Sequence, residues 1–195
     1  MARKTKKEIE VKVLYDPKEK ITDYTKELID LRIGKDKIKI VEVERATVKP
    51  LDITTGLPCK ISTSDVTILI REKDSNSEWI PTTLAIELKR GLDAFSSLYS
   101  NKQRLFDEIS RCKEYGHRLY FISENSMSDT IAQIQKVPRL KNTGAENSHL
   151  DQMIELNRFL TSNGFDSVIT CGKSMAWSIR RVIKHYIKEN KLQYL

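Results

Sequence analysis

The sequence of 195 residues has few of the residues that build disulfide-rich or zinc-stabilised proteins. Its three cysteines and three histidines are scattered, and they form neither a disulfide framework nor a zinc-ligand spacing. No apolar run is long enough to cross a bilayer, so we expect neither a signal peptide nor membrane contact. These absences favour an intracellular protein, cytoplasmic or nuclear, and leave carboxylates as the candidate ligands of any metal.

Charge is what the sequence does have. It contains 34 lysines and arginines against 27 aspartates and glutamates, a net charge of +7. A positive field attracts polyanions, of which nucleic acid is the commonest, although an ordinary basic protein is the alternative. We expect a basic tail over residues 1–7 and a single domain over 8–195, a length sufficient to bury a core.

The hydrophobic pattern predicts alternating strands and helices. Strands are predicted at 8–15, 37–48, 66–70, 82–88, 118–123 and 165–170. Helices are predicted at 22–33, 93–115 with a break near Ser100, 129–136, 149–162 and 174–190. This order predicts an α/β fold with a mixed central sheet flanked by helices on both faces. The stretch 125–148 is predicted to be a mobile loop around its short helix.

One predicted strand carries an acid and a base among apolar residues. Glu87 and Lys89 are two residues apart, so strand alternation places both on one face. An ion pair at a sheet edge is one interpretation. The other starts from Asp65, which opens the strand predicted to form a hairpin with this one. Two adjacent carboxylates repel each other, and a divalent cation such as Mg²⁺ or Mn²⁺ relieves that repulsion.

Four motifs together resemble the nuclease domain of the XPF/Hef family, a branch of the PD-(D/E)XK nuclease superfamily. Asp16-Pro17-Lys18-Glu19 is similar to the family's DSRE-like motif, Ser64-Asp65-Val66 to its GDY-like motif, and Glu87-Leu88-Lys89 to its ERK motif. Asp93, Ser97 and Arg104-Leu105-Phe106 follow at nearly the family's spacing. The resemblance runs from about residue 9 to residue 188. Leu88 stands where the family has an arginine.

The resemblance implies a restriction-endonuclease-like fold and a metal-dependent DNA endonuclease. Asp65, Glu87 and the backbone carbonyl of Leu88 would hold Mg²⁺ or Mn²⁺, with Lys89 positioning the water. Asp16 and Glu19 would complete the acidic pocket or bind a second ion. The implied substrate is branched or flap DNA, in DNA repair or recombination. A Holliday-junction or restriction-type nuclease, and a catalytically silent module for DNA binding or dimerisation, are the alternatives.

Basic residues near these motifs are candidates for phosphate contacts, with a solvated helix face as the alternative. They are Lys18, Arg90, Lys102, Arg104, Arg111 and Lys113. Because the family often pairs two such domains, we also expect a homodimer or heterodimer through the helix at 174–190. Trp177 and Tyr186 are its candidate interface residues.

Overall fold

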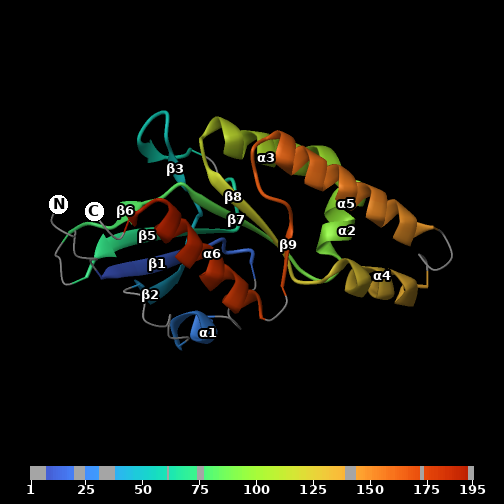
Figure 1. Ribbon diagram of the computed structural model, residues 1–195, viewed down its shortest axis with the longest axis horizontal. Helices are drawn as coiled ribbons and strands as arrows, with labels where there is room; N and C mark the ends of the chain where they lie inside the picture. Colours follow the sequence, from blue (N-terminus) through green and yellow to red (C-terminus); the bar gives the residue numbers. More distant parts are fainter. Residues whose placement is uncertain are drawn as a thin grey trace.

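A mixed β-sheet runs through the centre of the computed structural model (Figure 1). The structure describes residues 8–19, 25–30, 38–60, 62–73, 77–138, 144–171 and 174–192. In sheet order the strands are β2 (Ile38–Arg45), β1 (Ile9–Tyr15), β5 (Val66–Glu72), β7 (Leu84–Lys89), β8 (Arg118–Ser123) and β9 (Ile169–Thr170), while β6 (Ile80–Pro81) pairs with β5. β5 is antiparallel to β1 and β7, and the other pairings along this order are parallel. The predicted mixed sheet is confirmed.

Helices cover both faces of this sheet, as predicted (Figure 1). They are α1 (Thr25–Asp30), α2 (Asp93–Ser100), α3 (Lys102–Glu114), α4 (Met127–Lys136), α5 (Ala145–Ser162) and α6 (Met175–Glu189). Ile86 of β7 packs in one hydrophobic cluster with Ile183 of α6. Ala85 packs in a second cluster with Ile109 of α3 and Leu156 of α5. The alternation of β7 therefore places Glu87 and Lys89, which share the face of Ala85, beneath α3.

The hairpin between β5 and β7 is irregular. In the described residues β5 pairs directly with β7 only between Val66 and Ile86. Farther along β5, Leu69 and Ile70 pair with β6 instead. Threonine hydroxyls bridge the gap: Thr67 donates to the carbonyl of Leu84 at 2.5 Å, and Thr82 to that of Ile68 at 2.9 Å. Side-chain hydrogen bonds thus replace part of the backbone ladder where the strands diverge.

Several boundaries differ from the sequence prediction. β9 is two residues long and does not span 165–170, because the preceding residues bind α5 instead. The amide of Val168 donates to Asn157 Oδ1 at 3.0 Å, and the amide of Phe165 donates to the carbonyl of Leu160. The predicted break between α2 and α3 is confirmed at Asn101. A small second sheet of β3 (Leu51–Asp52) and β4 (Leu57–Pro58) precedes β5.

Two helices occupy much of the stretch 125–148. α4 begins two residues earlier than predicted, because Ser126 and Asp129 form a reciprocal capping box at its start. α5 begins at Ala145, and residues 139–143 lie outside the described part, so the mobility of this stretch stays a prediction. The ends predicted for the first helix, at 22 and 33, also lie outside that part. No described helix has the length and apolarity to span a membrane.

Candidate active site

The ends of three neighbouring strands bring the predicted acidic motifs together. The amide of Asp16, which follows β1, donates to the carbonyl of Asp65 at 2.8 Å. The amide of Asp65, which precedes β5, donates to the carbonyl of Ile86 in β7 at 3.0 Å. Segments far apart in the sequence are thus joined by backbone hydrogen bonds at one end of the sheet.

Asp65 lies directly against the backbone of β7. Its Oδ2 accepts a hydrogen bond from the amide of Leu88 at 2.7 Å. Burial and the negative charge of Glu87 raise the pKa of Asp65 well above its usual value. The Leu88 amide and the Lys89 ammonium only partly offset this effect. Two carboxylates therefore share a site in which ionising both is costly.

Glu87 and Lys89 form a buried ion pair on the face of β7 that lies under α3. Lys89 Nζ is 2.5 Å from Glu87 Oε1, and each side chain is 11% exposed. Burial alone would lower the pKa of Lys89, but the charges of Glu87, Asp65 and Glu108 raise it on balance. Lys89 is therefore an ammonium, a group that can orient a water or a phosphate oxygen but cannot accept a proton.

The turn after β1 places its two acids differently. Asp16 Oδ1 accepts a hydrogen bond from the amide of Lys18 at 2.8 Å, so this carboxylate stabilises its own turn. Glu19 is half-buried, and burial raises its pKa while the charges of Arg90 and Lys89 oppose that shift. The charge of Glu19 also contributes to the raised pKa of Asp65.

Glu108 of α3 belongs to the same site, although sequence reasoning did not include it among the functional residues. It lines a small cavity with Glu87, Thr63 and Cys112. Burial and the charge of Glu87 raise the pKa of Glu108. A signal was present in the sequence: Glu108 follows Leu105 by three residues and precedes Cys112 by four, so it falls on the apolar stripe of an amphipathic helix, where an acid is unusual.

The donor set fits a hard cation held by two carboxylates. In the part of the chain that the structure describes, no three histidine, cysteine, aspartate or glutamate side chains lie close enough to hold a metal ion. The candidate ligands are therefore the carboxylates of Asp65 and Glu87, next to the backbone of Leu88. The Lys89 ammonium already forms an ion pair with Glu87. All candidate donors are oxygens, which suits Mg²⁺ or Mn²⁺.

The candidate phosphate-binding residues are not equally available. Lys102 is 2.7 Å from both carboxylate oxygens of Glu155, an ion pair that joins α3 to α5. Lys18 is exposed, and the Arg104 side chain is 70% exposed. Arg90 and Arg111 are half-buried, and Arg90 acts on Glu19. Lys18, Arg104 and Lys113 are therefore the exposed members of this set.

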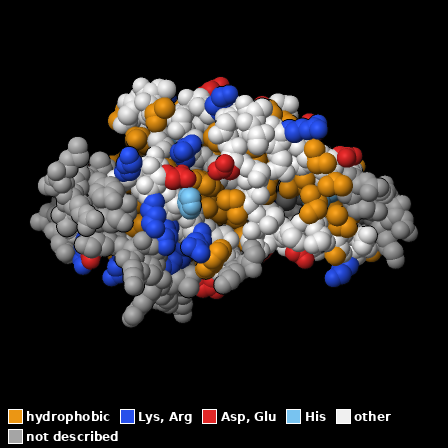
Figure 2. All heavy atoms as spheres, in the orientation of Figure 1, with side chains coloured by type: hydrophobic (Ala, Val, Ile, Leu, Met, Phe, Trp, Pro, Cys, Tyr) orange, Lys and Arg blue, Asp and Glu red, His pale blue; other side chains and the backbone are white. Residues whose placement is uncertain are grey.

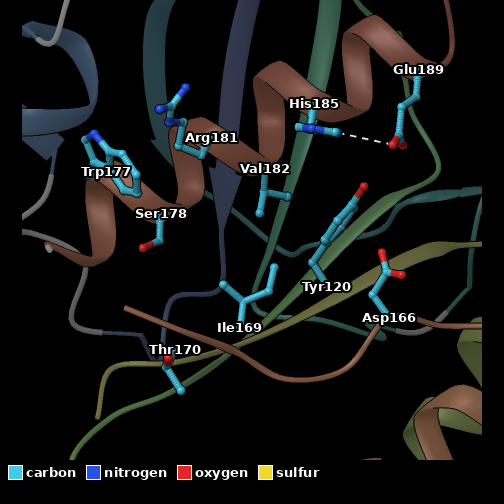
Figure 3. A pocket seen from close by; sticks show the side chains of 10 residues that line it. All are labelled: Tyr120, Asp166, Ile169, Thr170, Trp177, Ser178, Arg181, Val182, His185 and Glu189. Atoms are coloured by element: carbon cyan, nitrogen blue, oxygen red, sulfur yellow. Dashed lines mark hydrogen bonds and ion pairs between the residues drawn. The ribbon is translucent and has the colours of Figure 1, made fainter. Parts of the chain in front are cut away.

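A separate groove of about 300 Å³ lies beside α6 and contains none of the predicted catalytic residues (Figure 3). In Figure 2 basic side chains gather around this helix, next to an apolar hollow. Arg181 lies over the Trp177 ring at 4.8 Å, and His185 contacts Glu189 at 3.1 Å.

The prediction that Tyr186 lies at a dimer interface is wrong. Tyr186 is 4% exposed, and its hydroxyl accepts a hydrogen bond from the amide of Thr83 at 3.1 Å. Its face of α6 packs against the sheet and is closed to a partner.

Comparisons with known proteins give structural matches alone. No family model matches the sequence, and no curated protein matches it. Among solved structures, the chain is similar to XPF from Aeropyrum pernix in complex with DNA, with a TM-score of 0.49 and 20% identity over 91% of this chain and 66% of that one. It is also similar to XPF from Aeropyrum pernix, with a TM-score of 0.45 and 16% identity over 90% of this chain and 61% of that one. The chain thus spans less than two thirds of the second structure's length and about two thirds of the first's.

Proposed function

We propose that the chain is a divalent-metal-dependent DNA endonuclease of the XPF type that hydrolyses phosphodiester bonds. The observation that carries this proposal is the buried group of Asp65, Glu87 and Lys89. A buried carboxyl, Asp65, whose ionisation the charge of Glu87 opposes, beside a charged lysine, is an arrangement that a structural ion pair does not require. The resemblance of the motifs around them supplies the reaction class.

In this proposal Asp65, Glu87 and the carbonyl of Leu88 would hold Mg²⁺ or Mn²⁺. The bound ion would stabilise negative charge that develops on the phosphodiester group. Lys89 would donate hydrogen bonds to the attacking water and hold it in place, since its raised pKa keeps it charged. Glu19, in the turn after β1, would extend the acidic pocket, and Asp16 would keep that turn in shape.

DNA would approach along the accessible basic residues. Arg104 and Lys18 would contact phosphates, with Arg90 and Arg111 closer to the acids, while Lys102 would first have to release Glu155. Branched or flap DNA is the proposed substrate, which would place the protein in repair or recombination. Preferred cleavage of a four-way junction over a flap would indicate a Holliday-junction nuclease instead. Preferred cleavage of a linear duplex would indicate a restriction-type nuclease.

Cleavage assays with Mg²⁺ or Mn²⁺ and a panel of branched DNAs test the proposal. Glu87→Ala removes a ligand, and we expect it to lower cleavage by about 10³-fold. Glu42→Ala is the matched control, since Glu42 also pairs with a strand lysine but is 48% exposed. Cleavage by Glu87→Ala at the rate of the unsubstituted protein would rule out the assigned site.

A catalytically silent DNA-binding module is the second candidate. It is favoured by the two-carboxylate donor set among the described residues and by Leu88 at the position of the family's arginine. This candidate predicts salt-sensitive DNA binding that needs no divalent metal, with no cleavage of any substrate in the panel. Binding that persists in EDTA without cleavage would therefore favour it over the endonuclease.

We also propose that a partner chain, identical or related, binds at the groove beside α6. Trp177 borders this groove, and Arg181 and Glu189 supply opposite charges along it (Figure 3). Sedimentation of the unsubstituted protein and of Trp177→Glu tests this proposal. A dimer in the first and a monomer in the second is the expected result, and a monomer in both would contradict it.

A further inference from the structure

The buried ion pair of β7 occupies one of the two carboxylate oxygens of Glu87. Lys89 Nζ lies 2.5 Å from Glu87 Oε1, and both side chains are 11% exposed. A divalent cation between Asp65 and Glu87 would compete with the ammonium for the same carboxylate. Two cations that close together repel strongly in a partly desolvated site. A metal that takes this oxygen would displace the ammonium from Glu87, and a buried ammonium needs another partner.

Glu108 is placed to become that partner. It projects from α3, which covers the face of β7 that carries Glu87 and Lys89, and it lines the same small cavity as Glu87. Its negative charge already acts on the Lys89 ammonium. Its ion pair with Arg104 is loose, with Nε 3.9 Å from Oε1 and an arginine side chain that is 70% exposed. Such a pair contributes little, so it can be given up at small cost.

The other carboxylates near Lys89 are less suited to this role. Asp65 would be a ligand of the same metal, and its Oδ2 is hydrogen-bonded to Leu88. Glu19 interacts more strongly with Arg90 than with Lys89. Of the acids whose charges act on Lys89, this leaves Glu108, which is outside the proposed metal ligands and whose pair with Arg104 is loose.

We propose that Glu108 is a positioning residue that takes over the Lys89 ammonium when a divalent metal binds Asp65 and Glu87. This inference rests on the proposed metal-dependent function. Lys89 stays protonated throughout, so no proton is gained or lost in the transfer. The ammonium would end between α3 and the metal, where it can donate a hydrogen bond to a water or a phosphate oxygen. Glu108 would thus act on the reaction through Lys89.

A double-mutant cycle on metal affinity tests this role without measuring cleavage. Mn²⁺ alone is titrated calorimetrically into the full chain, Glu108→Gln, Lys89→Met and the double variant. With Lys89 present, we expect Glu108→Gln to weaken Mn²⁺ binding about five- to tenfold, because the displaced ammonium loses its partner. With Lys89→Met there is no ammonium to move, and the same substitution should change affinity by less than about twofold. Glu114→Gln, at the exposed end of the same helix, is the control and should leave affinity unchanged.

The cycle also defines the results that overturn the proposal. An equal weakening in both backgrounds would mean that Glu108 acts on the ion directly, and no weakening in either would remove it from the site. If Glu108→Gln unfolds, Glu108→Ala provides the same cycle, while Glu108→Asp keeps the charge and should retain most of the affinity. Cleavage failing while the Mn²⁺ cycle holds would overturn the proposed endonuclease alone. Absence of Mn²⁺ binding to the unsubstituted chain would overturn both.

Discussion

Two acid–base clusters lie in the same sheet and differ chiefly in burial. In the outer cluster, Lys12 of β1 is 3.0 Å from Glu42 and 2.5 Å from Glu44 of β2. The two glutamate side chains are 48% and 46% exposed. In the inner pair, Lys89 is 2.5 Å from Glu87, and both side chains are 11% exposed. The chemistry and the distances are alike, so neither separates a structural pair from a functional one.

Burial and the neighbouring charge separate them. Water can solvate the outer glutamates, and ion pairs of that kind contribute between zero and about 1 kcal/mol. The inner pair has lost most of that solvation, and Asp65 adds a second carboxylate whose charge a single lysine cannot balance. A buried excess of negative charge is costly to maintain, and the proposed metal site would offset that cost.

The largest effect should come from removing each lysine in turn. Lys89→Met leaves Glu87 and Asp65 buried without their ammonium, and we expect a loss of about 3 to 5 kcal/mol in the free energy of unfolding. Lys12→Met should cost no more than about 1 kcal/mol. Urea unfolding at pH 7 in EDTA measures both.

Adding Mn²⁺ sharpens the same measurement. A divalent cation can replace the missing ammonium at the inner site, so Mn²⁺ should restore more stability to Lys89→Met than it adds to the unsubstituted protein. Mn²⁺ should leave the unfolding free energy of Lys12→Met unchanged relative to its effect on the unsubstituted protein. Equal losses for the two lysine variants, or equal responses to Mn²⁺, would show that the two clusters do not differ as proposed.

A smaller effect should appear in the pH dependence of stability. His117 is 3% exposed, and its Nδ1 is hydrogen-bonded at 3.1 Å to Oγ1 of Thr63, two residues before Asp65. Burial lowers the pKa of His117 to about 4, an effect that the charge of Asp52 only partly opposes. Between about pH 6.5 and 4 the unfolded chain therefore binds more protons, so stability is complete above this window and falls as the pH falls through it.

His117→Asn keeps a hydrogen-bonding group for Thr63 but does not titrate. We expect the loss of unfolding free energy between pH 7 and pH 5 to be smaller in this variant by about 1 to 2 kcal/mol. His149 stays in place as an internal reference, since burial also lowers its pKa. An unchanged pH dependence would mean that His117 is charged or solvated in the folded protein.

Most of the fold could be predicted because its strands and helices have strong periodicity. The strand at 118–123 and the helix from Ser174 match the structure closely, since each has a continuous apolar face and clear ends. The strand predicted from Phe165 failed for a tertiary reason. Its first residues are apolar enough for a strand, but Asn157 and Leu160 bind their amides at the end of α5. Sequence periodicity does not reveal which neighbour takes a backbone hydrogen bond.

The candidate site likewise has features that could be predicted from the sequence and features that could not. The common face of Glu87 and Lys89 followed from strand alternation, and the proximity of Asp65 followed from the predicted hairpin; both are seen in the structure. The difference between Asp16 and Glu19 could not be predicted, because it depends on a turn in which Asp16 Oδ1 binds the amide of Lys18. Glu108 was not among the predicted site residues. Its contact with the site depends on how α3 crosses β7, and that packing is not encoded in the local pattern.

The smallest expected effect comes from salt. Coulomb interactions between exposed charges are screened over about 3 Å at 1 M salt, whereas buried pairs are screened much less. Raising NaCl from about 0.05 M to 1 M should therefore remove most of the cost of Lys12→Met, a change of a few tenths of a kcal/mol. The cost of Lys89→Met should stay the same within error over this range. Unfolding free energies of each variant, compared with the unsubstituted protein at the same salt concentration, cancel the general effect of salt on stability. If the cost of Lys89→Met also vanished in 1 M salt, the inner pair would be open to solvent ions, and its assignment as a desolvated site would be wrong.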